Sequence, residues 1–169
     1  MDRIWKMTLM MVGIILVDQF TKGYIQHEYT LGEIRPVIDG LFNLTYVQNK
    51  GAAFGFGANH SDLFRIIMFL VLPTGACFWL MYLIWQTRHT ALLLCTSYSM
   101  ILAGAIGNLI DRFSLRFVVD MFDFYYGTWH FAAFNVADSA ITVGAIFLIY
   151  DFLFLEKKRI EKQELKKTS

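Results

Sequence analysis

Two aspartates, Asp120 and Asp138, stand in apolar stretches where a carboxylate is unusual. Asp120 follows Phe-Val-Val and precedes Met-Phe, while Asp138 lies between Val-Ala and Ser-Ala-Ile. Two carboxylates that lie close together do not both ionise easily, so they share one proton. One can then act as a general base on water while the other, protonated, polarises a carbonyl. The pair therefore suggests an aspartyl hydrolase.

Each aspartate also has a purely structural interpretation. Asp120 can be a strand residue that points to water. Asp138 can be an anion at the start of a helix, where the helix dipole favours negative charge. Asp111 and Asp123 compete with both for the catalytic role, because they lie in the same part of the chain.

Two short groups share one layout, Asn108-Leu-Ile-Asp111 and Asn135-Val-Ala-Asp138. Residues three apart lie on one helical face, so each asparagine can hold its aspartate or a bound ligand. Arg112 follows Asp111 directly, and this favours an ion pair between the two at the end of a span.

Asp18 and Lys22 are four residues apart, a spacing that suits a salt bridge within one helix. A role in orienting substrate is the alternative for this pair.

Other hydrolytic chemistry has no matching motif in the sequence. H-E-x-x-H, G-x-S-x-G and a serine–lysine pair at helical spacing are absent. So are the D-T-G of soluble aspartic proteases and the G-x-G-D of presenilin-like proteases. Gly51, Gly55 and Gly57 are not followed by lysine and Ser/Thr at P-loop spacing, so nucleotide binding is not indicated.

The composition requires an apolar environment around these residues. Of 169 residues, 56% are hydrophobic and only 17% are charged, below the roughly 25% usual for a soluble domain. A spanning helix needs about 20 mostly apolar residues. We expect one integral membrane domain over residues 1–169, with spans at about 4–25, 63–86, 90–112 and 135–155. The first span is expected to be retained, because no small-residue cleavage site follows it.

The basic residues predict the orientation of these spans. Nine of the 15 Lys and Arg residues lie on the side that holds both termini and the connection near Arg88, and the other six are spread over longer segments. The positive-inside rule therefore puts both termini, with the basic tail 156–169, in the cytoplasm.

The two longer loops, at about 26–61 and 113–134, then face outward and differ in character. Residues 32–58 combine glycines and one proline with an alternating stretch, which predicts short strands forming a small extracytoplasmic β-platform. Residues 113–134 are rich in Phe, Tyr and Trp, which favour the headgroup level, and we expect an aromatic outer loop. The predicted fold class is a membrane all-α protein of four transmembrane helices with this platform.

Five ordered blocks resemble the lipoprotein signal peptidase family (signal peptidase II). They are Asp18-Gln-Phe-Thr-Lys22, Asn49-Lys-Gly-Ala-Ala-Phe-Gly55, Gly104-Ala-Ile-Gly-Asn-Leu-Ile-Asp-Arg112, Val118-Val-Asp120 and Phe134-Asn-Val-Ala-Asp-Ser-Ala-Ile141. They occur in the family's order. One departure is Met121, where the family commonly has Phe. Asp123 matches no block.

The resemblance implies a role for each matched residue. Asp120 and Asp138 would be the catalytic dyad of a membrane aspartic endopeptidase. Substrate-binding and supporting positions would be Asp18, Lys22, Asn49, Gly51, Asn108, Asp111, Arg112 and Asn135, and Phe54 is a further expected substrate contact.

The resemblance also implies the substrate and the setting. The substrate would be a diacylglyceryl-modified prolipoprotein, cleaved just before its lipidated cysteine at the outer face of the bacterial inner membrane. Globomycin-type inhibitors and membrane lipid are expected partners, and no metal, cofactor or nucleic acid is implied.

A non-enzymatic proton-coupled transporter or channel is the alternative function. Intramembrane acids suit such a protein. A conduit, however, needs polar residues across the bilayer midplane, and here they gather toward one end of the spans.

Overall fold

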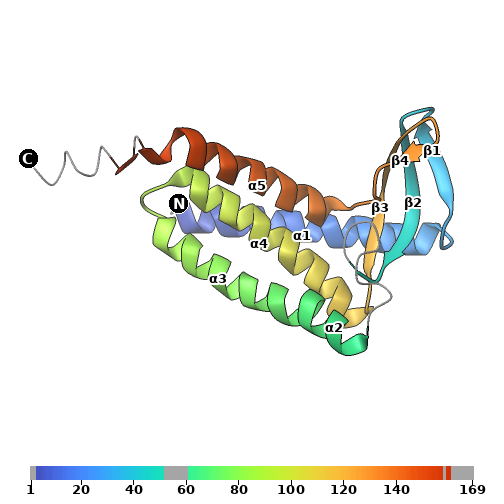
Figure 1. The fold of residues 1–169 in the computed structure, drawn as a ribbon, viewed down its shortest axis with the longest axis horizontal. Coiled ribbons are helices and arrows are strands. Elements are labelled where there is room, and N and C mark those ends of the chain that lie inside the picture. The colour runs from blue at the N-terminus through green and yellow to red at the C-terminus, as the bar shows by residue number, and fades with distance from the viewer. Residues whose placement is uncertain (1–2, 52–60, 158, 161–169) are drawn as a thin grey trace, which may run out of the picture.

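Four helical segments of the protein are long and apolar enough to span a membrane. The structure is a computed structural model that describes residues 3–51, 61–157 and 159–160. The segments are α1 (Arg3–Glu28), a continuous rod formed by α2 (Asp62–Ile66), η2 (Ile67–Val71) and α3 (Leu72–Thr87), then α4 (Leu92–Ser114) and α5 (Val136–Phe154). The four predicted spans are confirmed, with small shifts at their ends. In Figure 1 they lie side by side, and the sheet stands at one end of the bundle.

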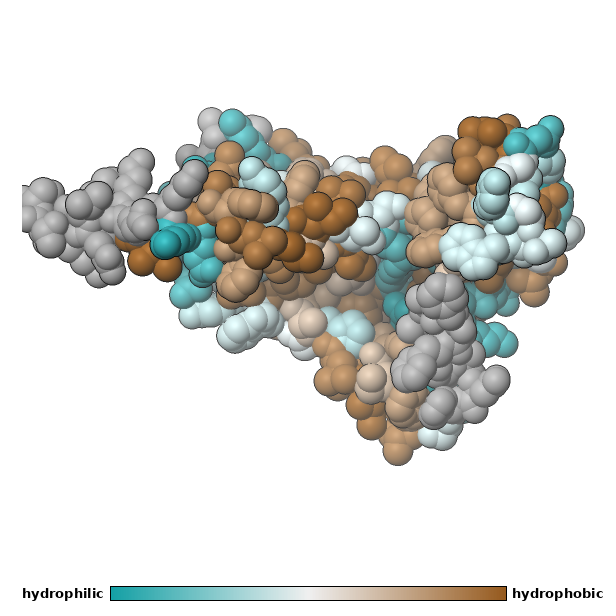
Figure 2. All heavy atoms as spheres, turned by 45° about the horizontal axis from the view of Figure 1, so that its top comes forward, coloured by the Kyte–Doolittle hydropathy of each residue, from teal (hydrophilic) through white to brown (hydrophobic). Residues whose placement is uncertain are grey.

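Helix α4 is the centre of the bundle. It packs against α1, α3 and α5. Half of the residues in its most apolar stretch are buried, whereas only 6% of the residues in the corresponding stretch of the rod Asp62–Thr87 are buried. Large apolar side chains on the other helices are instead exposed, as Phe20, Phe78 and Phe152 are. Figure 2 shows apolar side chains spread over the outside of the helical part. In a membrane these side chains face lipid, so the buried surface of α4 is where the polar residues can gather.

The rod changes its winding just before Pro73. Segment η2 is a π-helical turn that ends two residues before this proline. Proline has no N–H to donate to the carbonyl four residues earlier, and its ring clashes with that carbonyl. The wider turn accommodates the proline without ending the helix.

Close contact between α4 and α5 depends on glycines. A Cβ atom added to Gly104 would lie 2.3 Å from the carbonyl oxygen of Ala137 and 2.7 Å from Ile141. Gly144 similarly faces the carbonyl of Ser97 at 2.9 Å. Small residues at such crossings let two membrane helices approach until their backbones touch.

The two longer connections between the helices form one antiparallel sheet rather than a platform and a separate loop. Its strands are β1 (Ile34–Ile38), β2 (Phe42–Asn49), β3 (Val118–Tyr126) and β4 (Trp129–His130), in the order β1-β2-β3-β4. The expected strands in the first segment are confirmed. The prediction of an aromatic loop at 113–134 is wrong over β3, because this strand is buried on both faces in its first half and so shows no polar alternation.

The register between β2 and β3 brings distant residues together. Asp120 pairs with Val47, and Asn49 pairs with Val118. An irregularity between Leu44 and Val47 shifts the pairing. The aromatic side chains predicted for the loop instead pack on the sheet, where Phe122 and Phe124 contact Phe134.

We predict that Gly104→Ala lowers the apparent Tm in detergent, while Gly13→Ala does not. The added methyl at Gly104 meets the backbone of α5, and overpacking of this kind costs about 1–3 kcal/mol. At Gly13 nothing lies within 4 Å of the new Cβ atom, so this variant controls for the glycine-to-alanine change itself. Equal Tm values for the two variants would contradict the close packing of α4 on α5.

Candidate active site

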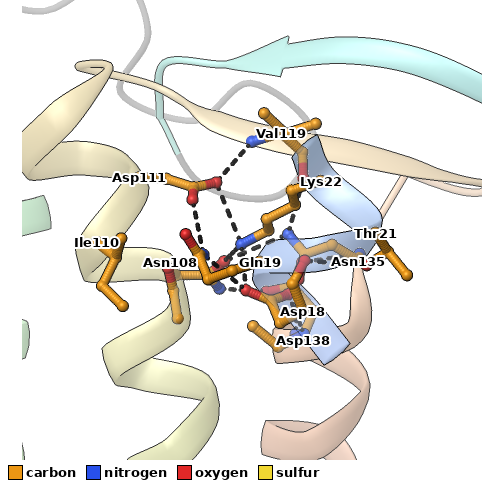
Figure 3. Close-up of polar contacts among 12 residues, drawn as sticks. Asp18, Gln19, Thr21, Lys22, Asn108, Ile110, Asp111, Val119, Asn135 and Asp138 are labelled. Atoms are coloured by element: carbon orange, nitrogen blue, oxygen red, sulfur yellow. Dashed lines mark hydrogen bonds and ion pairs between the residues drawn. The ribbon is translucent and has the colours of Figure 1, made fainter. Parts of the chain in front are cut away.

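A buried lysine organises the polar residues between the helices and the sheet. Lys22 is 2% exposed, and its Nζ lies 2.8 Å from Oδ2 of Asp18 and 3.1 Å from Oδ2 of Asp111. The same ammonium donates to Oδ1 of Asn108 at 3.0 Å. An ammonium has three protons, so each acceptor matches one donor. Figure 3 shows the three acceptors around Lys22.

The two carboxylates around Lys22 extend the network to other elements. Asp18 accepts the backbone N–H of Ala137 at 2.8 Å, at the start of α5. Asp111 accepts the backbone N–H of Val119 in β3 at 3.0 Å and the side-chain amide of Gln19 at 3.0 Å. One buried charge cluster therefore fixes α1, α4, α5 and β3 relative to one another.

The expected salt bridge between Asp18 and Lys22 is confirmed, but the expected ion pair between Asp111 and Arg112 is wrong. Asp111 pairs with Lys22, and Arg112 donates to the carbonyl of Gly51 at 3.1 Å. Adjacent residues on a helix point in different directions, so their charges do not meet.

The side-chain amides of both asparagines donate to carboxylates outside their own group. Asn108 donates to Oδ1 of Asp138 at 2.7 Å, and Asn135 donates to Oδ1 of Asp120 at 2.8 Å. The side chain of Asn135 also lies 3.3 Å from Oδ1 of Asn108. The asparagines therefore form a bridge between Asp120 and Asp138.

Asn135 and Asp138 also begin helix α5. The side chain of Asn135 accepts the backbone N–H of Asp138 at 2.9 Å, and Oδ2 of Asp138 accepts the backbone N–H of Asn135 at 3.3 Å. This is a capping box, which satisfies backbone donors that the helix leaves free. Asp138 is therefore an anion at a helix start, as its structural interpretation expects, and it also faces the polar network.

Asp120 is buried in β3 rather than pointing to water, so that alternative is wrong. Its side chain accepts amide protons from Asn49 at 3.0 Å and from Asn135 at 2.8 Å. Burial, and after it the charge of Asp138, raises the pKa of Asp120 to about 7. A carboxyl with this pKa is protonated for part of the time at neutral pH.

A cleft of about 540 Å³ gives access to both aspartates. Polar side chains line one part of it, and Phe134, Ile141 and Val143 line another. The polar lining residues are Asn49, Asn108, Arg112, Asp120, Asp138, Ser139 and Thr142. Two carboxylates with different environments, beside an apolar wall, can activate a water molecule and polarise a bound carbonyl.

The structure brings together nearly all the residues that the sequence singled out. Asp18, Lys22, Asn108, Asp111 and Asn135 form the network beneath Asp120 and Asp138, while Arg112 and Asn49 line the cleft and Gly51 contacts both through its backbone. Phe54 lies outside the described residues. Within the described ranges, no three His, Cys, Asp or Glu residues are grouped closely enough to hold a metal ion.

One feature of the site was not predicted. Gln19 donates to Asp18, Asp111 and the carbonyl of Gly107, and the only signal in the sequence was a polar residue at the end of a span. Asp123, in contrast, lies apart from this network, where it contacts Asn43 and His130.

Comparison with known proteins matches the chain to one family over most of its length. The family model described as Signal peptidase (SPase) II matches residues 10–154. The lipoprotein signal peptidase of Syntrophus aciditrophicus is 41% identical, over 86% of this chain and 91% of its own length. That of Desulforapulum autotrophicum is 43% identical, over 88% and 92%. A solved bacterial membrane enzyme superposes with a TM-score of 0.78 at 30% identity, over 89% of this chain and 88% of its own.

We predict that Lys22→Met destabilises the protein by about 3–5 kcal/mol, because two buried carboxylates lose their cation. The control is Arg35→Gln, which removes a half-exposed partner of Glu33 and should change the stability much less, because solvent screens this pair. Chemical unfolding in detergent measures both. Equal effects of the two substitutions would contradict the central role of Lys22.

We predict that Asp120 titrates near neutral pH. Its protonated carbonyl stretch in infrared difference spectra should disappear with a midpoint of about 7, and this signal should be missing in Asp120→Asn but present in Asp123→Asn. The folded state holds this proton more tightly than the unfolded chain, so stability should fall as pH rises from about 4 to about 7. A midpoint near the ordinary aspartate value would contradict the prediction.

Proposed function

The chain belongs to the signal peptidase II family of proteases, which removes signal peptides from prolipoproteins, and on this premise we propose that it is an aspartic endopeptidase whose dyad is Asp120 and Asp138. The observation that carries the proposal is that both carboxylates line one cleft and are bridged by Asn108 and Asn135. The relatives give no support to the alternative of a transporter or channel.

We propose that Asp138 is the general base and that Asp120 carries the proton. Both carboxyls accept side-chain amide protons, but only Asp138 also accepts a backbone N–H at the start of a helix, where the helix dipole favours an ionised carboxylate. Asp120 is 2% exposed whereas Asp138 is half-buried, and burial raises the pKa of Asp120 to about 7, which supports the protonated state for Asp120.

The reaction then follows from these two states. Asp138 takes a proton from a water molecule, whose oxygen attacks the carbonyl carbon of the scissile peptide bond, while the Asp120 carboxyl donates its proton to the carbonyl oxygen. In the tetrahedral intermediate Asp138 is protonated and Asp120 is ionised. When the C–N bond breaks, Asp138 passes its proton to the leaving amine and Asp120 recovers a proton from the hydroxyl. The dyad is restored.

The proposed substrate is a prolipoprotein whose cysteine carries diacylglycerol, with cleavage just before that cysteine. The chemistry of the cleft supports this, because Ile141 and Val143 continue from the dyad along membrane helix α5. Acyl chains can remain at that level in the leaflet while the scissile bond reaches the aspartates. Globomycin-type inhibitors are expected to bind in the same cleft.

The protein is a multi-pass bacterial membrane protein, and we propose that its active site faces outward with both termini in the cytoplasm. The distribution of basic residues supports this orientation. Arg3 and Arg88 contact one another at the end of the bundle opposite the sheet. The supporting roles of Asp18, Lys22 and Asp111 follow from their contacts beneath the dyad.

We predict that Asp120→Asn and Asp138→Asn each lower kcat for a diacylglyceryl-modified prolipoprotein peptide by at least about 10²–10⁴-fold, because each removes one of the two proton transfers. Asp123→Asn is the matched control, since it removes a buried carboxylate from the same strand that contacts Asn43 and His130 instead. Cleavage in detergent is followed by mass spectrometry. A near wild-type rate in either dyad variant would show that the assignment is wrong.

A further inference from the structure

A second cavity, of about 390 Å³, lies beside the active-site cleft and is strongly basic. It is bounded by the end of α4, the start of α2 and the chain around Lys50. In the part of the chain that the structure describes, its charged lining consists of four cations and one acid, namely Lys50, Arg65, Arg112, Arg116 and Asp62. Asp62 forms an exposed ion pair with Arg65 at 3.4 Å, so the lining keeps an excess of three positive charges. A concave surface lined mainly by one sign of charge concentrates ions of the opposite sign.

Arg65 holds the walls of this basic cavity together. Its Nε donates to the carbonyl of Lys50 at 3.2 Å, and its Nη2 donates to the carbonyl of Arg116 at 3.4 Å. The guanidinium therefore joins the segment that follows β2 to the connection between α4 and β3. The cavity is formed by the folded chain and does not need a ligand to bring its cations together.

Arg116 has an unusual backbone conformation, with a φ of 71°. Among the described residues it is the only one other than glycine with a positive φ. A left-handed conformation is common at the residue after the C-cap of a helix, and Arg116 follows Leu115, the C-cap of α4. The turn leads the chain from α4 into β3, and the carbonyl of Arg116 accepts the hydrogen bond from Arg65 there.

The remaining lining of the basic cavity is apolar and belongs to a membrane span. Ile66, Phe69 and Leu70 lie on the rod that starts at Asp62, and Leu63 and Ile67 beside them are 68% and 43% exposed. Cations thus stand at the end of a span, directly next to side chains that face lipid. A polypeptide anion would not need this apolar surface, whereas a phospholipid has a charged group and acyl chains at matching levels.

We propose that the basic cavity binds the phosphate headgroup of an anionic glycerophospholipid, with an acyl chain lying along Ile66 and Phe69. Arg112 lines both this cavity and the active-site cleft, so a bound lipid would also restrain Arg112 beside the dyad. Lipid binding here is independent of the proposed proton transfers.

Competition between two lipids tests the proposal. The purified full-length protein is mixed with equal amounts of phosphatidylglycerol and phosphatidylcholine that have the same acyl chains, and bound lipid is counted by native mass spectrometry. We expect a preference for phosphatidylglycerol that falls about five-fold in Arg116→Gly, in line with the usual contribution of one cation near an anionic headgroup. Glycine adopts the backbone conformation of Arg116 without strain, so the fold should be unchanged.

Three further variants separate the loss of the Arg116 charge from other causes of weaker lipid binding. Arg116→Lys keeps the charge and should keep the preference, and Arg35→Gln removes an outer cation distant from the cavity and should also keep it. Asp120→Asn should bind lipid like the wild type, so loss of peptidase activity and loss of lipid binding are distinguishable. Equal binding of the two lipids, or an unchanged preference in Arg116→Gly, would overturn the proposal. So would displacement of the lipid by inorganic phosphate or by an acidic peptide, because either would identify a different ligand.

Discussion

The arrangement of the end of the bundle that carries the sheet depends on the buried ammonium group of Lys22. A buried charge is tolerated only when it is paired and fully hydrogen-bonded. Lys22 meets this requirement with Asp18, Asp111 and Asn108, and these acceptors come from two helices. Because Asp18 and Asp111 also bind backbone N–H groups of α5 and β3, moving any one of the four elements would leave a charge without a partner.

The proposed dyad is built across two kinds of structure. Asp120 comes from a strand and Asp138 from the first turn of a helix, so their relative position depends on both strand register and helix start. A slip of one residue in β3 would turn Asp120 to the other face of the sheet. The contact of Val119 with Asp111 and the bridge through Asn135 hold that register from the helical side.

Sequence alone was sufficient for the spans, because long apolar runs have few interpretations in a chain of this composition. It was also sufficient for the local pair Asp18–Lys22, whose contact is fixed by helical spacing. It failed for Asp111 and for Asn108, because their partners lie on other elements and spacing along one helix does not reveal contacts across the bundle. For Asn135 it found the contact with Asp138 at the start of α5 but not the one with Asp120. It failed for β3, because a strand buried on both faces loses the alternation by which strands are found. Some of the aromatic residues there, such as Phe122, pack on the sheet, while Tyr126 and Trp129 remain exposed.

The order of the network along the chain has a consequence for biosynthesis. Asp18 and Lys22 are on the first span, so this span can enter the bilayer with its charges already paired. Asn108 and Asp111 arrive with the third span and complete the cage around the ammonium. Only then do Asn135 and Asp138 emerge from the ribosome, and Asn135 both starts the last helix and joins the two aspartates. The nascent chain can therefore pair its buried charges first and complete the Asp120–Asp138 pair last, so an incomplete chain would lack the proposed catalytic pair.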